Sequence, residues 1–174
     1  MRTRVPKDVL ALYDSLPVVQ IDTLLGSWRG SELPTGHPLD GLLAAFGWHG
    51  KRFDSADSVH PLVFDRARGA GLVSVQPALM PIGLVLKLGK RLPHPAVGGV
   101  FRLLQPLMTT SAPAARLRMI EHRGLVTAAM VYDALPIIDV FRHVDEDTLL
   151  GIMDVRGSDQ PYPFVLHRED ASPS

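Results

Sequence analysis

The chain contains no cysteine among its 174 residues, so disulfides, thiolate catalysis and cysteine-based metal sites are excluded. It also lacks a charge excess, because 18 Lys and Arg residues balance 18 Asp and Glu residues. Nucleic-acid binding needs a basic face, so no nucleic-acid partner is expected. The sequence has no Gly-rich phosphate loop, Gly-x-Ser-x-Gly elbow or Walker motif, which argues against nucleotide-dependent and serine-hydrolase chemistry.

Long apolar runs are missing as well. No stretch reaches the ~20 residues that a membrane-spanning helix needs, and the segment Met1 to Lys7 carries no apolar signal-peptide core. We therefore expect a cytoplasmic protein. With 46% hydrophobic and 21% charged residues, the composition is that of a globular chain, and its length suits one domain.

Proline and glycine are frequent, at 15 residues each, which predicts many turns and few long helices. Four segments have helical periodicity: 6–15, 20–25, 38–46 and 97–108. Nine segments have strand character: 26–30, 47–54, 59–66, 71–77, 116–122, 125–132, 137–144, 148–155 and 162–168. The last five follow one another through short turns and predict an antiparallel meander.

Antiparallel strands in this number tend to close on themselves, because closure removes exposed edges. We therefore expect a mainly β protein, a closed antiparallel lipocalin-like (calycin-type) β-barrel with a few short helices. Segment 78–112 is rich in Leu, Val, Pro and Gly, and we interpret it as a helical lid. One barrel domain is expected over 1–170, followed by a disordered tail at 171–174.

The turn Arg123-Gly124 suits a two-residue hairpin that pairs His122 with Leu125. Alternation then puts one set of side chains on a shared apolar face: Leu117, Met119, Glu121, Val126, Ala128, Met130 and Tyr132. We expect this face to point inward and the face with Arg116 and Arg118 to meet water. A register slip of one residue would reverse the assignment.

The stretch Gly26-Ser27-Trp28-Arg29-Gly30 matches a Gly-x-Trp-x-Gly signature and leads into Leu33-Pro34-Thr35-Gly36-His37-Pro38. It resembles the bacterial GXWXG family. The stretches Val131-Tyr132-Asp133 and Pro136-Ile137-Ile138-Asp139 resemble the domain of unknown function that accompanies GXWXG. The resemblance implies a GXWXG-like part at about 10–70 and the meander at about 114–169, and it implies no activity. The Gly-x-Trp opening is also similar to that of lipocalins and nitrobindin-type haem barrels, which implies a barrel.

Candidate catalytic residues are His37, Asp40, Tyr132 and Asp139. His37 could be a general acid or base oriented by Asp40. Alternatively, Asp40 caps backbone amides and His37 only supports the loop. Tyr132 and Asp139 are polar residues on otherwise apolar strands, where a group with a shifted pKa could transfer protons.

Candidate ligand-binding residues are the following: Trp28, Trp48, Met119, Glu121, Met130, Phe141 and Arg142. Trp28 is either a cavity wall or a structural plug. Arg142 is expected on one face with Asp154, as a pair that orients a ligand or ties strands together. The seven histidines have no metal-ligand spacing, so neither a metal nor a cofactor is expected. A haem ligand, which the likeness to nitrobindins implies as an alternative, would be His167.

Three functions stay open. The first is binding of a hydrophobic small molecule, fatty-acid-, isoprenoid- or polyketide-like, in the barrel. The second is a cofactor-independent enzyme, an isomerase, cyclase or lyase that transfers protons in the same cavity. The third is a haem-binding barrel. Segment 81–91 could touch a membrane transiently or simply cover the barrel mouth, and a homodimer also stays open.

Overall fold

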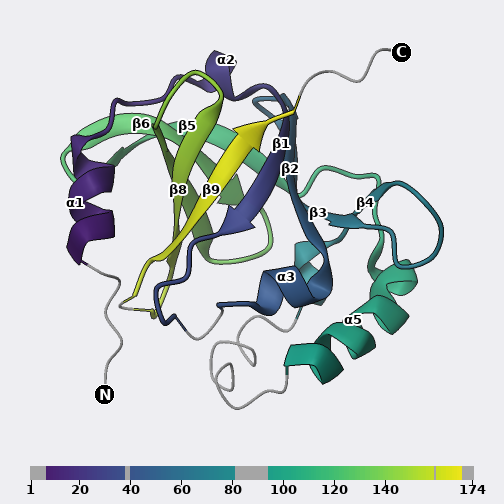
Figure 1. Cartoon of the computed structure of the whole chain (residues 1–174). Coiled ribbons are helices and arrows are strands. Elements are labelled where there is room, and N and C mark those ends of the chain that lie inside the picture. The colour runs from purple at the N-terminus through teal and green to yellow at the C-terminus, as the bar shows by residue number, and fades with distance from the viewer. Residues whose placement is uncertain (1–6, 38–39, 81–93, 159, 170–174) are drawn as a thin grey trace.

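The computed structural model describes residues 7–37, 40–80, 94–158 and 160–169. In these ranges, nine strands form one antiparallel sheet in the order β2-β1-β9-β8-β7-β6-β5-β3-β4 (Figure 1). The strands are β1 Gly26–Glu32, β2 Trp48–Ser55, β3 Ser58–Asp65, β4 Leu72–Ser74, β5 Ala115–His122, β6 Leu125–Tyr132, β7 Ile137–His143, β8 Thr148–Val155 and β9 Tyr162–Arg168. The mainly β fold with a consecutive C-terminal meander is therefore confirmed.

The strand pairings run in a ring, because β2 pairs with β3 as well as with β1. The shortest pairing in the ring is that between β3 and β5, which share one paired position, Val59 with Ala115. The helices are α1 Lys7–Ser15, α2 Ile21–Leu24, α3 Leu42–Phe46 and α5 His94–Met108, with a 3-10 turn η1 at Pro77–Leu79. Figure 1 shows α2 at one end of the ring, α3 and α5 at the other, and α1 beside the strands.

The expected helices and strands differ from the observed ones at a few boundaries. The helix expected over 38–46 begins only at Leu42, because Gly41 before it has a left-handed backbone with φ of 81°. Of the strand expected over 71–77, only β4 forms, and Pro77 starts η1 instead. The helix expected over 97–108 is confirmed as α5 and begins earlier, at His94. Segment 81–91 and the tail 171–174 lie outside the described residues.

The β5–β6 hairpin has the predicted register, with His122 opposite Leu125. Its inward face is confirmed at Leu117, Ala128, Met130 and Tyr132, which are buried. The same expectation is wrong for Met119, Glu121 and Val126, which are exposed.

These three residues lie on the part of the hairpin where a segment distant in the sequence enters between β6 and β7. β6 pairs with β7 only from Ala129 to Val131. Beyond that point, Val19 lies beside β6, where its carbonyl accepts a hydrogen bond from Ala128 N and its N–H donates to Thr127 Oγ1. Val18 forms a bridge with Arg142 of β7. The tip of the β5–β6 hairpin therefore extends beyond the part of β6 that pairs with β7.

Two apolar clusters hold the fold together. The larger one fills the interior of the ring with buried side chains such as Trp28, Phe53, Met130, Phe141 and Leu166. The smaller one lies on the outer face, where Tyr13 of α1 packs on Leu150 and Ile152. The side chains of the larger cluster fill only part of the interior, and a cavity occupies the rest.

Candidate functional site

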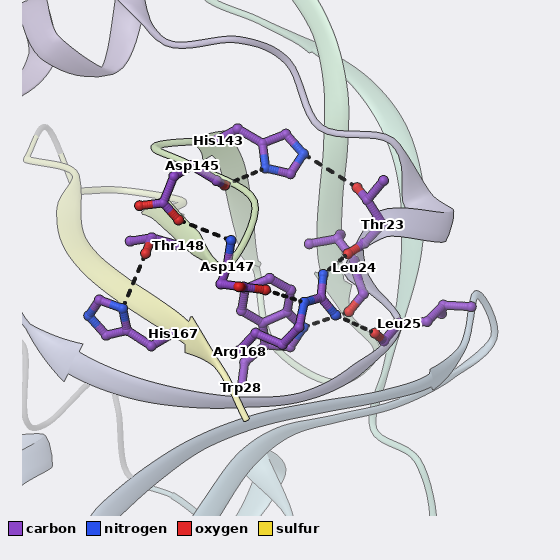
Figure 2. Close-up of polar contacts among 10 residues, drawn as sticks. All are labelled: Thr23, Leu24, Leu25, Trp28, His143, Asp145, Asp147, Thr148, His167 and Arg168. Atoms are coloured by element: carbon purple, nitrogen blue, oxygen red, sulfur yellow. Dashed lines mark hydrogen bonds and ion pairs between the residues drawn. The ribbon is translucent and has the colours of Figure 1, made fainter. Parts of the chain in front are cut away.

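Trp28 lies at the end of the ring beside α2, with Arg168 next to its indole ring (Figure 2). Its side chain is fully buried, and its indole N–H donates to the Leu24 carbonyl at 2.7 Å. The Arg168 guanidinium lies 4.2 Å from the ring centroid of Trp28. Arg168 also donates to the carbonyls of Thr23 and Leu25, at 2.7 and 3.1 Å. Trp28 has the geometry of the structural plug, and it does not line the cavity at the opposite end.

The opposite end contains a cavity of about 350 Å³, which we call the α3–α5 cavity. Helix α3 contributes Leu42 and Phe46 to its lining, and α5 contributes Val97, Phe101 and Leu104. The strands contribute Trp48, Leu62, Ile137, Met153 and Phe164. Helix α5 lies at this end of the ring, and the lining of the cavity is almost entirely apolar.

The apolar lining is interrupted by an ion pair. Lys51 Nζ lies 2.7 Å from Asp139 Oδ2, and the two side chains are 3% and 1% exposed. Lys51 Nζ also donates to the Pro61 carbonyl at 3.2 Å. The other oxygen of the carboxylate, Asp139 Oδ1, has no hydrogen-bond partner among the described residues. A buried carboxylate oxygen without a partner is costly, so this atom is available to a donor on a ligand.

Three aromatic rings surround the Lys51 ammonium. Its Nζ lies 5.0 Å from the ring centroid of Phe164, 5.7 Å from that of Trp48 and 5.8 Å from that of Tyr132. Rings at these distances favour a cation electrostatically. They also exclude water, which strengthens the pairing between Lys51 and Asp139.

Strand alternation explains how these groups meet. Lys51 shares the inner face of β2 with Phe53, and Asp139 shares the inner face of β7 with Phe141. Asp139 pairs with Met130 of β6, so Tyr132 is its diagonal neighbour on the same face. Burial raises the pKa of Asp139, while the charge of Lys51 opposes the rise. Burial and the charge of Asp139 raise the pKa of Tyr132 well above its usual value, so its phenol stays protonated.

Tyr162 completes the polar part of the cavity lining. Its hydroxyl donates to Glu32 Oε1 at 2.6 Å, and burial raises its pKa. The Glu32 carboxylate also accepts the backbone N–H groups of Leu43 and Ala44 at 3.3 and 3.2 Å. Tyr162 and Glu32 thus fix the start of α3 beside the cavity.

The predicted pair of His37 and Asp40 lies outside the cavity, where His37 packs against the ring of Tyr162. Asp40 Oδ2 accepts the N–H of Thr35 at 2.9 Å and that of Gly36 at 2.5 Å, as a capping residue would. His37 is buried, and its ring centroid lies 5.0 Å from that of Tyr162. Neither residue lines the α3–α5 cavity. The geometry is that of the structural alternative for this loop.

The structure brings three of the predicted site residues to the cavity and leaves the others elsewhere. Tyr132, Asp139 and Trp48 line it. Met130 and Phe141 are buried in the packed interior, whereas Met119 and Glu121 are exposed.

Arg142 faces the opposite side of the sheet from the cavity. Its guanidinium lies 5.2 Å from the ring centroid of Tyr13, beneath α1. Asp154 is exposed, and no ion pair joins it to Arg142 in the described part of the chain. The expected ligand-orienting pair is therefore not formed.

The geometry does not favour a haem or metal centre. His167 is exposed on the outer face of β9, where its Nδ1 lies 3.3 Å from Thr148 Oγ1 (Figure 2). It therefore cannot ligate a group inside the α3–α5 cavity. No group of three or more His, Cys, Asp and Glu residues within the described ranges could hold a metal ion.

None of the described helices is long and apolar enough to cross a membrane.

Sequence reasoning missed Lys51 and Tyr162. The signal for Lys51 was present, since it alternates with Phe53 on a predicted strand in the same way as Tyr132 alternates with Met130. A charged residue at such a position marks a buried pair or a site. Tyr162 stands at the first position of its strand, and no local pattern there indicates a cavity.

Two family models match the chain. The model described as "GXWXG protein" matches residues 11–69, and the domain of unknown function DUF4334 matches residues 113–168. The chain is also similar to a protein from Thermomonospora curvata of known crystal structure. That protein is 33% identical, with a TM-score of 0.71, and the match covers 95% of this chain and 88% of the other. No curated protein matches the chain.

Proposed function

This chain belongs to the GXWXG family, with the accompanying C-terminal domain of unknown function, and we propose that it binds a hydrophobic small molecule. The α3–α5 cavity carries the proposal. Its volume of about 350 Å³ lies within the range of small-molecule sites, ~300–1,000 Å³. Each methylene buried there would contribute ~0.8 kcal/mol, so a fatty-acid-, isoprenoid- or polyketide-like chain needs few polar contacts.

The proposal includes a closed lipocalin-like (calycin-type) β-barrel as the container. The ring of strand pairings supports closure, and the Trp28 plug supports one sealed end. Helix α5 would then be the lid at the open end. A cytoplasmic location remains part of the proposal.

The outer side of α5 supports a further part of the proposal, which concerns partners. Leu103 and Leu107 on this helix are 66% and 79% exposed. Exposed apolar side chains beside a ligand entrance suit transient contact with a membrane that supplies the ligand. They equally suit a homodimer, which the dependence of sedimentation on protein concentration would reveal.

Native mass spectrometry of the purified protein tests the binding function. We expect mass increments that disappear after extraction with organic solvent, and an apolar compound in the extract. A protein that carries no increment, and that shows no increment after incubation with apolar compounds, would contradict the proposal.

A second candidate function is proton-transfer catalysis in the same cavity, by an isomerase, cyclase or lyase. The buried Lys51–Asp139 pair beside Tyr132 favours it, because such a site can hold a carboxyl group with a raised pKa against an apolar substrate. The extracted ligand, incubated with fresh protein, should then change into a new compound. The conversion should be lost in Asp139→Asn and Tyr132→Phe. A ligand recovered unchanged would leave binding alone.

A further inference from the structure

We infer that the α3–α5 cavity selects neutral apolar molecules that end in a hydroxyl group, and that it discriminates against the same chains ending in a carboxylate. This inference rests on the proposed binding function and narrows its ligand class. It follows from which hydrogen-bonding atoms the buried polar groups of the cavity still offer.

The first of these atoms is an acceptor. Asp139 Oδ2 is engaged by Lys51 Nζ, whereas Oδ1 has no partner among the described residues. The side chain is 1% exposed and lines the cavity, so bulk water does not satisfy it. A ligand that donates a hydrogen bond to Oδ1 would remove the cost of leaving this atom unpaired.

The second is a donor. A lysine ammonium has three N–H donors, and within the described structure Lys51 directs them to two acceptors, Asp139 Oδ2 and the Pro61 carbonyl. Its third donor has no acceptor among the described residues, and Lys51 is one of the residues that line the cavity. The cavity thus offers one free acceptor and one free donor on neighbouring groups.

A hydroxyl group matches this pair, because it donates one hydrogen bond and accepts others. A carboxylate has acceptors only, so it cannot satisfy Asp139 Oδ1. It would also place a second negative charge beside Asp139, while the one nearby cation is already neutralised. An ester accepts as well but brings no charge, so it separates the effect of the missing donor from the effect of charge.

A ligand series of constant chain length tests the inference on the unmodified protein at pH 8. The series is 1-decanol, methyl decanoate, decanoate and decane, each titrated against the neutral fluorescent probe N-phenyl-1-naphthylamine. We expect 1-decanol to displace the probe roughly tenfold or more tightly than methyl decanoate or decanoate, from the value of one hydrogen bond to a charged group. Decane should bind, with lower affinity than 1-decanol.

Two outcomes overturn the inference in distinguishable ways. If the probe binds and decanoate or the ester competes as well as 1-decanol, the head-group selection fails while the binding function stands. If neither the probe nor any member of the series binds, the proposed function itself fails, and the inference fails with it.

A matched pair of variants attributes the selection to one atom. Asp139→Asn removes the charge that neutralises Lys51, so the affinity for decanoate relative to that for 1-decanol should rise by roughly tenfold or more. Asp154→Asn makes the same change on the exposed face and should keep the wild-type preference. An unchanged preference in a folded Asp139→Asn variant contradicts the assignment. If that variant does not fold, the ligand series on the wild type still decides.

Discussion

The indole ring of Trp48 lies directly across the backbone of Gly30, the second glycine of the Gly-x-Trp-x-Gly motif. A Cβ atom added at Gly30 would lie 2.3 Å from the Trp48 ring, which is closer than two non-bonded carbon atoms can approach. Trp48 also lines the α3–α5 cavity. The motif therefore has contacts at both ends of the ring, since Trp28 lies at the end beside α2 and Gly30 packs against Trp48, which lines the α3–α5 cavity.

Gly30→Ala should lower the free energy of unfolding by about 1–3 kcal/mol, the usual cost of overpacking. It should also weaken probe binding, because Trp48 must move. Urea unfolding and probe titration measure the two effects. Ser31→Ala, an exposed neighbour, should leave both unchanged. If Gly30→Ala matched that control, the contact with Trp48 would have no energetic role.

Two adjacent glycines of α5 form a matched pair. A Cβ at Gly98 would lie 2.5 Å from the Ala45 carbonyl oxygen of α3, whereas one at Gly99 meets nothing within 4 Å. Gly98→Ala should therefore force α5 away from α3 and destabilise the protein. Gly99→Ala should stabilise it by up to ~1 kcal/mol through helix propensity. Thermal unfolding of both variants checks the prediction, and equal shifts would show that the two helices do not pack as described.

Stability should fall as the pH is lowered below about 7, because two histidines have depressed pKa values. Burial is the main cause for His60, with a further contribution from Arg52, and burial is also the main cause for His122. A depressed folded-state pKa means that the unfolded chain binds more protons. The contribution is thus present above the unfolded pKa of ~6.5 and is lost as pH falls through the folded value.

Urea unfolding at pH 7.5 and pH 5.5 measures this loss. The double variant His60→Gln, His122→Gln should lose less stability between the two pH values than the wild type does. An equal loss in both proteins would assign the dependence to other groups.

Arg142 should contribute little to stability through its charge. It is fully buried, yet its Nε and Nη1 atoms have no partner within the described ranges, and its Nη2 makes only a long hydrogen bond of 3.4 Å to the His122 carbonyl. Replacing such a group with an apolar side chain of similar length is often neutral or stabilising. We therefore expect Arg142→Met to unfold within about 1 kcal/mol of the wild type and to bind the probe normally. Arg142→Ala, which leaves a cavity, should cost about 2–5 kcal/mol. A large loss in Arg142→Met would show that the guanidinium has a necessary partner.

Local patterns predicted most of the strands. The register of the β5–β6 hairpin follows from Arg123-Gly124 at its turn, and both residues have positive φ values, 53° and 82°. Strand alternation also limits what a site can contain. Phe141 and Arg142 are adjacent on β7, so only one of them could face the interior, although both were predicted to bind ligand.

Long-range contacts explain what could not be predicted. Met119 and Glu121 lie on the part of the hairpin beyond the β6–β7 pairing, where Val18 and Val19, about 100 residues earlier, lie between β6 and β7. The Lys51–Asp139 pair joins two strands that do not neighbour each other in the sheet order. Strand alternation could have predicted that each of the two side chains points inward, but it could not have predicted that they contact each other.

Occupancy of the α3–α5 cavity by an apolar ligand is tested most directly by titrating N-phenyl-1-naphthylamine into two tryptophan variants of α5. Val97 lines the cavity, so Val97→Trp should fill it and weaken probe binding by roughly tenfold or more. Leu107 is 79% exposed on the same helix, so Leu107→Trp should bind the probe as the wild type does. Equal affinity in the two variants, or no saturable binding to the wild type, would contradict a ligand site in this cavity.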